Sequence, residues 1–131
     1  MSYDVHLQRL RDGDLAEGGN DLVRAALGAH LVRHGEEITN LRAADGDTAE
    51  VYGLEGTSGF MATHIGGDPV WDLLVQAARA GDLVIMPQSG PACVVAPEQV
   101  QHLPDGLRET VVLVEDGAHL FRAIEDFTDW Q

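Results

Sequence analysis

The sequence predicts an α+β fold: a single mixed, largely antiparallel sheet with three main helices packed mostly on one face. Three observations predict this class. Several segments alternate apolar and polar residues, as strands with one covered face do, and two short continuous apolar runs are typical of buried strands. Three longer segments carry apolar residues at helical spacing. The chain fits one domain, residues 1–131, which is long enough to bury a core without disulfides or metal.

The N-terminal third begins with a predicted strand over residues 2–10, where apolar and polar side chains alternate. A loop is expected over 11–19. Asn20 is a suitable N-terminal cap for a predicted helix through 21–34, whose apolar residues share one face. Gly35 is a suitable terminator for that helix.

The middle of the chain, residues 36–59, is polar and acidic. We expect a short strand near 38–41, then the turn "ADGD", then a strand over 48–54. A further strand over 59–65 is predicted to pair with the last one as a hairpin, through the turn sequence "EGTSG".

A helix with clear boundary signals follows the hairpin. Asp68 is the predicted cap, Pro69 takes the favoured first helical position, and Gly81 ends the helix. The predicted buried stripe of this helix consists of Val70, Trp71, Leu74, Val75 and Ala78.

The C-terminal third contains two apolar runs, 83–87 and 110–114, which predict two more strands. The segment between them is irregular, with a short helical turn expected near 97–102. A closing helix is predicted over 116–127, and Trp130 beyond it is expected to pack back onto the domain. The residues of this helix expected to point inward are Leu120, Phe121 and Ile124.

The charge of the chain is unusual. Twenty-two acidic residues face eight basic ones, all of them arginine, so the formal net charge is -14. This charge repels phosphate backbones, so we expect no nucleic-acid binding, and it speeds encounter with a basic partner. The single cysteine and the lack of a signal peptide or membrane-length apolar run predict a cytoplasmic protein that does not contact a membrane.

Two segments supply most of the negative excess. Residues 36–59 hold six acidic residues and one arginine, and residues 115–131 hold five and one. A solvated face is the general expectation for such runs, but ordinary surfaces mix both signs, and this imbalance favours a binding surface. The predicted partner-binding residues are Glu36, Glu37, Asp45, Asp47, Glu50, Tyr52 and Glu55.

Other candidate sites give weaker signals. The turn "HIGGDPVWD" lacks a phosphate-binding motif and places Asp68 and Asp72 at a helix start, so it predicts scaffold. His30 and His34 have metal-ligand spacing on the predicted helix, but the intervening Glu and a third ligand are missing, so we predict no metal site. Cys93 has no basic neighbour and is predicted to be a small buried hydrophobe.

The size, the element order, the charge and the opening strand "MSYDV" together resemble the small immunity proteins that neutralise polymorphic toxins in bacteria. The resemblance covers the whole chain through these general features, and no signature motif contributes to it. It implies a protein-binding inhibitor, not an enzyme, that docks an acidic surface over the active-site cleft of a basic toxin or enzyme. The implied mechanism needs no cofactor, and Tyr52 would slow dissociation of the complex.

Two alternatives stay open on the sequence. A small enzyme or ligand-binding domain would have a pocket at strand ends near His64, Asp68, Pro87 and Cys93, with His64 as a general base. A structural subunit would instead pair its apolar strand edges in a homodimer. A gene immediately upstream that encodes a secreted protein with a basic C-terminal domain would favour the inhibitor.

Overall fold

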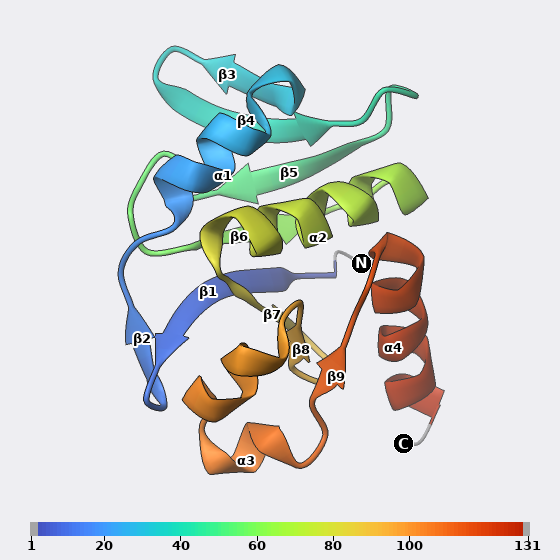
Figure 1. Cartoon of the computed structure of the whole chain (residues 1–131). Coiled ribbons are helices and arrows are strands. Elements are labelled where there is room, and N and C mark those ends of the chain that lie inside the picture. The colour runs from blue at the N-terminus through green and yellow to red at the C-terminus, as the bar shows by residue number, and fades with distance from the viewer. Residues whose placement is uncertain (1–2, 130–131) are drawn as a thin grey trace.

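The computed structural model describes residues 3–129, and within them one mixed, mostly antiparallel sheet of nine strands is combined with helices, which confirms the predicted α+β class (Figure 1). The strand order is β3-β4-β5-β6-β1-β7-β8-β9, and β2 pairs with β1 outside this path. The pairing of β8 with β9 is parallel, and the other pairs are antiparallel. The strands are β1 (Val5–Arg11), β2 (Asp14–Ala16), β3 (Leu31–His34), β4 (Glu37–Arg42), β5 (Thr48–Tyr52), β6 (Phe60–Thr63), β7 (Val84–Pro87), β8 (Cys93–Val94) and β9 (Val112–Leu113). The helices are α1 (Asn20–Ala26), α2 (Asp68–Gly81), α3 (Asp105–Arg108) and α4 (Gly117–Asp129), with 3-10 helices η1 (Gly28–His30) and η2 (Pro97–His102).

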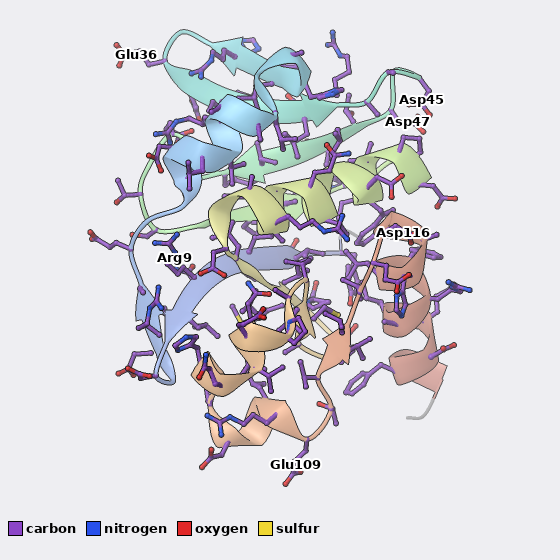
Figure 2. All side chains as sticks on the ribbon, viewed as in Figure 1. Arg9, Glu36, Asp45, Asp47, Glu109 and Asp116 are labelled. Carbon is purple, nitrogen blue, oxygen red and sulfur yellow. The ribbon has the colours of Figure 1, made fainter. Side chains whose placement is uncertain are left out.

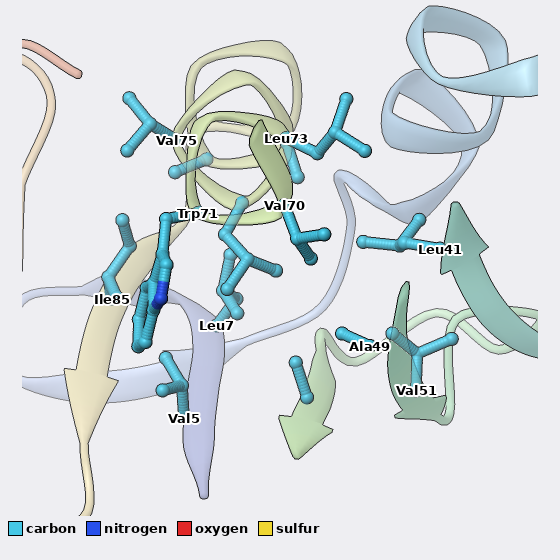
Figure 3. Close-up of a cluster of buried hydrophobic side chains, with 14 of the residues drawn as sticks. Val5, Leu7, Leu41, Ala49, Val51, Val70, Trp71, Leu73, Val75 and Ile85 are labelled. Carbon is cyan, nitrogen blue, oxygen red and sulfur yellow. The ribbon is translucent and has the colours of Figure 1, made fainter. Parts of the chain in front are cut away.

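The main core lies between the sheet and helix α2, which is flanked by α1 and α4 (Figure 1). Val5 and Leu7 of β1 are fully buried there, under Val70 and Trp71 of α2 (Figure 3). Successive side chains of a strand point to opposite faces, so the strand residues between these core positions point away from the helices. None of the described helices is both long and apolar enough to cross a bilayer.

Strand β7 is buried on both faces, as its continuous apolar run predicts. Ile85 belongs to the helix-side core, whereas the adjacent Val84 packs into a second cluster with Leu10, Val94 and Leu103. The segment that follows β8 contributes to this second cluster and contains η2, which confirms the predicted helical turn near 97–102.

The predicted helix over 21–34 is wrong in its second half. Helix α1 has only seven residues, and Leu31–His34 forms the edge strand β3 instead. Gly35 does not end a helix but lies in the left-handed region (φ 63°) in the tight turn that joins β3 to β4. Pairing with β4 therefore overrides the helical spacing, and His30 and His34 do not share a helix face.

Two of the predicted helix caps are also wrong. The residue before the first turn is Gly19 in α1 and Gly67 in α2, and neither helix has a side-chain cap hydrogen bond. Asn20 and Asp68 are each the first residue inside the helix. Helix α2 ends at Gly81 and carries a proline in its first turn, as predicted.

Three smaller expectations need correction. The predicted loop over 11–19 contains β2, which forms a hairpin with β1 through a turn at Asp12. The strand predicted over 110–114 is reduced to the two residues of β9 at the edge of the sheet. Phe121 is 39% exposed rather than inward, and its ring meets the edge of Trp71 at a centroid distance of 5.7 Å.

Candidate functional site

The sheet face opposite α2 is covered by η2 and α3 at its β7 end, where Met86 packs against the second cluster, and is open over β5 and β6. A row of side chains crosses this face in register. Tyr52 of β5 pairs with Met61 of β6, Met61 pairs with His6 of β1, and His6 pairs with Met86 of β7. Directly paired residues point to the same face of a sheet, so these four side chains, which we call the open-face row, lie side by side. Tyr52 is 52% exposed and His6 is also exposed, so the row is accessible to a partner.

Glu50 connects two other side chains on the same face. The Tyr52 hydroxyl donates a hydrogen bond to Glu50 Oε2 at 3.3 Å, and His64 Nδ1 lies 2.9 Å from the same oxygen. His64 reaches this position from the turn after β6, where its backbone has a φ of 52°. The Glu50 carboxylate is therefore positioned between the Tyr52 hydroxyl and the His64 imidazole.

The electrostatic field at Tyr52 is negative. The charge of Glu50 is the largest of the effects that raise the pKa of the Tyr52 phenol, and Asp4 and Glu37 add to it. A raised phenol pKa means that further negative charge is disfavoured at this point. The same field favours a cation placed against the exposed ring.

A hollow of about 390 Å³ lies beside Tyr52. Its sides are formed by Met61, His6, Gln8 and the loop 53–59, which joins β5 to β6. The hollow is thus continuous with the open-face row and ends against a glycine-rich loop.

The buried side chain of Asn20 fixes this loop. Its Nδ2 donates hydrogen bonds to the carbonyls of Gly53 (3.1 Å) and Gly59 (2.9 Å), and its Oδ1 accepts one from the Gly59 N–H (2.9 Å). Gly59 has a φ of 79°, and a Cβ there would lie 2.3 Å from the Leu7 carbonyl oxygen, so only glycine fits. One amide therefore clamps both ends of the loop and satisfies its inner backbone groups.

Arg24 of α1 holds the middle of the same loop. Its Nη1 donates to the Leu54 carbonyl at 2.7 Å and to the Gly56 carbonyl at 3.0 Å, and the Leu54 side chain is fully buried. The Gly18 N–H also donates to the Thr57 carbonyl at 2.7 Å. These contacts give the wall of the hollow a defined shape in the unbound protein.

The predicted partner-binding residues do not gather in one place. Glu50 and Tyr52 lie together on the open face, whereas Glu36 lies in the turn between β3 and β4 and Glu37 is the first residue of β4. Glu55 Oε2 accepts a hydrogen bond from the Ile38 N–H nearby (3.2 Å). The residues that form this second group are Arg24, Arg33, Glu36, Glu37 and Glu55, around a hollow of about 590 Å³.

Asp45 and Asp47 lie at the opposite end of the strands from Glu36, in the turn between β4 and β5 (Figure 2). Within this turn the Asp47 N–H donates to Asp45 Oδ1 at 3.0 Å. Asp116 and Glu109 occupy further separate positions in Figure 2. The negative charge is therefore spread over separate parts of the molecule, and Glu50 is the predicted carboxylate that lies beside Tyr52 on the open face.

Two residues of the alternative pocket, His64 and Cys93, do not lie together. Cys93 lies on β8, which is three positions along the sheet from β6, roughly 14 Å at ordinary strand spacing, so it does not meet His64. Burial raises the pKa of the Cys93 thiol to about 12, and its Sγ lies 3.5 Å from the Pro91 carbonyl oxygen. Among residues 3–129 no three His, Cys, Asp or Glu side chains come together as metal ligands.

A third hollow, a groove with a more apolar lining than the two described above, lies between α4 and the β8–β9 edge of the sheet. It measures about 620 Å³, and Val112, Ala123 and Phe127 line it together with Arg122. Leu113 beside it is half-exposed at the sheet edge. The expectation for Trp130 falls outside the described residues.

Sequence reasoning missed His6, Met61 and Met86. The alternation in β1 and β6 does place the first two on the face away from the core. The alternation does not reveal which strands are neighbours, because β1 pairs with strands far along the chain. Asn20 was noticed, but as a helix cap.

No family model, no curated protein and no solved structure matches this chain. Its function therefore has to be inferred from the geometry and charge of the site itself.

Proposed function

We propose that this chain is a cytoplasmic, immunity-type inhibitor that binds a basic toxin or enzyme through the open face and covers the active-site cleft of that partner. One observation carries the proposal. The exposed Tyr52 ring stands at the end of a row of methionine and histidine side chains, inside the negative field of Glu50, Asp4 and Glu37.

The long-range part of the mechanism is electrostatic steering. A formal net charge of -14 raises the rate at which a basic protein encounters the chain, and salt screens the attraction. Asp45 and Asp47 at one end of the strands, and Glu36 and Glu55 at the other, widen the surface that attracts the partner. They contribute mainly to the association rate.

The short-range part is the open-face row. Tyrosine is enriched among the residues that dominate binding energy, and methionine adapts its shape to a partner. Tyr52 and Met61 offer such a contact in register on neighbouring strands. Loss of this contact speeds dissociation, since mutations within an interface act mostly on that rate.

An inhibitor that acts by covering a cleft needs no catalytic residue, metal or cofactor of its own. The proposal assigns none to this chain, and it assigns no nucleic acid or membrane as a partner. The burial of Cys93 and its separation from His64 are compatible with this assignment.

The test uses the basic domain of the secreted protein encoded immediately upstream of this gene. We expect Tyr52→Ala to weaken its binding by about tenfold or more, mostly through faster dissociation, as stopped-flow and surface plasmon resonance measure it. The double charge reversal Asp45→Lys with Asp47→Lys should slow association, and the effect should shrink as salt is raised.

Glu109→Gln is the control, because it removes one negative charge from the residue after α3, away from Glu36, Asp45 and Asp47 (Figure 2). It should leave both rates nearly unchanged. A basic domain that binds with the same affinity to the Tyr52→Ala protein would show that this face is not the interface. The absence of any such upstream gene would count against the inhibitor itself.

A further inference from the structure

The geometry points to the hollow beside Tyr52 as a receptacle for one arginine side chain of the partner protein. This inference rests on the proposed function and deepens it, because it names the chemical group that the open face recognises. It follows from the lining, the acceptor groups and the rigidity of the hollow.

The lining contains no arginine, which sets this hollow apart. The groove beside α4 includes Arg122, and the hollow at the other acidic group includes Arg24 and Arg33. The residues around Tyr52 are instead apolar, neutral polar or histidine. An incoming guanidinium therefore meets no arginine of this chain and enters the negative field of Glu50, Asp4 and Glu37.

The groups in and beside the hollow suit a guanidinium. The half-exposed Tyr52 ring lines the hollow and is available for a cation–π contact. Glu50 is not part of the lining, but its carboxylate lies 3.3 Å from the Tyr52 hydroxyl and adds negative charge at that side. Gln8 and the hydroxyl residues Thr57 and Ser58 also line the hollow and can accept hydrogen bonds. Arginine fits this set better than lysine, because its planar group stacks on rings, donates in several directions and is weakly hydrated.

The wall of the hollow is formed before the partner arrives. Asn20 clamps the loop at Gly53 and Gly59, and Arg24 holds its middle. A preformed wall lowers the entropy cost of binding, so a single side chain can be recognised without folding the loop around it. The acidic turn at Asp45 and Asp47 differs, because the Asp45 side chain accepts a hydrogen bond from the Asp47 N–H within the turn itself.

The experiment uses the full chain and three tripeptides with blocked ends: Gly-Arg-Gly, Gly-Lys-Gly and Gly-citrulline-Gly. Backbone amide NMR at pH 8, where an ordinary imidazole is neutral, follows their titration up to about 20 mM. We expect the arginine peptide to shift amides of residues 53–61 with millimolar affinity. The lysine peptide should bind about threefold or more weakly, and the isosteric neutral citrulline peptide should leave these amides in place.

Two variants sharpen the result. Tyr52→Ala should weaken arginine-peptide binding by about tenfold, while Tyr52→Phe keeps the ring and should stay within about threefold of the parent. Glu109→Gln should bind as the parent does. The amide spectrum of each variant also reports whether it is folded.

Two outcomes would overturn the receptacle. One is no shift in residues 53–61 at the highest peptide concentration, and the other is equal binding by the parent and the Tyr52→Ala protein, which would indicate diffuse charge attraction. Either outcome leaves the inhibitor proposal standing, since that proposal is tested with the basic protein domain. The arginine peptide could bind selectively while the basic domain binds the Tyr52→Ala protein as tightly as the parent. That result would support the arginine receptacle and contradict the proposed interface.

Discussion

The two faces of strands β1, β5 and β6 differ in almost every property, although they are built from alternating residues of the same segments. On the helix side, Leu7, Val51 and Ala62 are buried in one apolar core. On the other side, His6 and Tyr52 are exposed, and no helix is seated on the row between them. The comparison teaches that alternate residues of one strand face the apolar core and the solvent, so neighbouring residues should differ strongly in how much their mutation changes stability.

The strongest test of this contrast replaces two adjacent residues of β1. Leu7→Ala removes a fully buried side chain and should lower the free energy of unfolding by about 2–5 kcal/mol. His6→Ala, one residue away on the exposed face, should change it by less than about 0.5 kcal/mol. Urea denaturation followed by circular dichroism measures both. Similar losses in the two variants would mean that the faces are not energetically distinct.

A second test breaks the connection between the faces. Asn20 belongs to α1 on the helix side, yet its amide clamps the loop that walls the hollow on the open face. Asn20→Ala removes the hydrogen bonds that Asn20 makes to the N–H and the carbonyl of Gly59, while the Gly53 carbonyl keeps the Gly56 N–H as a donor. The change should cost about 1–3 kcal/mol.

Hydrogen exchange adds a local measurement to that variant. The amide of Gly59 should exchange faster in Asn20→Ala, because its acceptor is gone. The amide of Val51 in the neighbouring strand serves as the internal control. An unchanged Gly59 amide would show that the clamp does not order the loop.

The smallest expected effect is a pH dependence of stability that arises from the buried Cys93 thiol. Burial raises the pKa of the Cys93 thiol from 9.0 to about 12, so above pH 9 the unfolded chain loses this proton while the folded chain keeps it. Stability from this group is complete below pH 9 and decreases as pH rises. Between pH 8 and pH 10 the loss should be about 1.4 kcal/mol.

Cys93→Ala removes this contribution, so its stability should decrease less over the same pH interval in parallel urea titrations. The raised pKa of Tyr52 acts in the same direction, but it is present in both proteins and cancels in the difference. Equal pH dependence in the two proteins would contradict a buried neutral thiol.

Local patterns predict the elements whose partners are close in the sequence. The hairpin of β5 and β6 and the helix α2 follow from alternation, glycine turns and a helix-start proline. The segment Leu31–His34 was misassigned because two apolar residues after a helix fit either structure, and only pairing with β4 decides between them. Tertiary contacts therefore set the limit of prediction for the fold.

The same limit applies to the candidate site. Tyr52 and Glu50 were predicted from composition and lie together on one strand. Asp45 and Glu36 lie close to them in the sequence, but the strands carry these residues to opposite ends (Figure 2). His6 could not be assigned to the site, because its register with Met61 depends on a pairing between strands far apart in the sequence.

The position of β1 in the middle of the sheet has a consequence for the order of folding. Val5 pairs with Ala62 on one side and with Pro87 on the other, so the first strand to be synthesised stays without either neighbour until β6 and then β7 have left the ribosome. Such distant pairings make folding slower than in proteins rich in local contacts. During that interval the apolar side of β1 is exposed to aggregation and to chaperones. The core is completed later still, because Cys93 of β8 and Leu120 and Ile124 of α4 also belong to it.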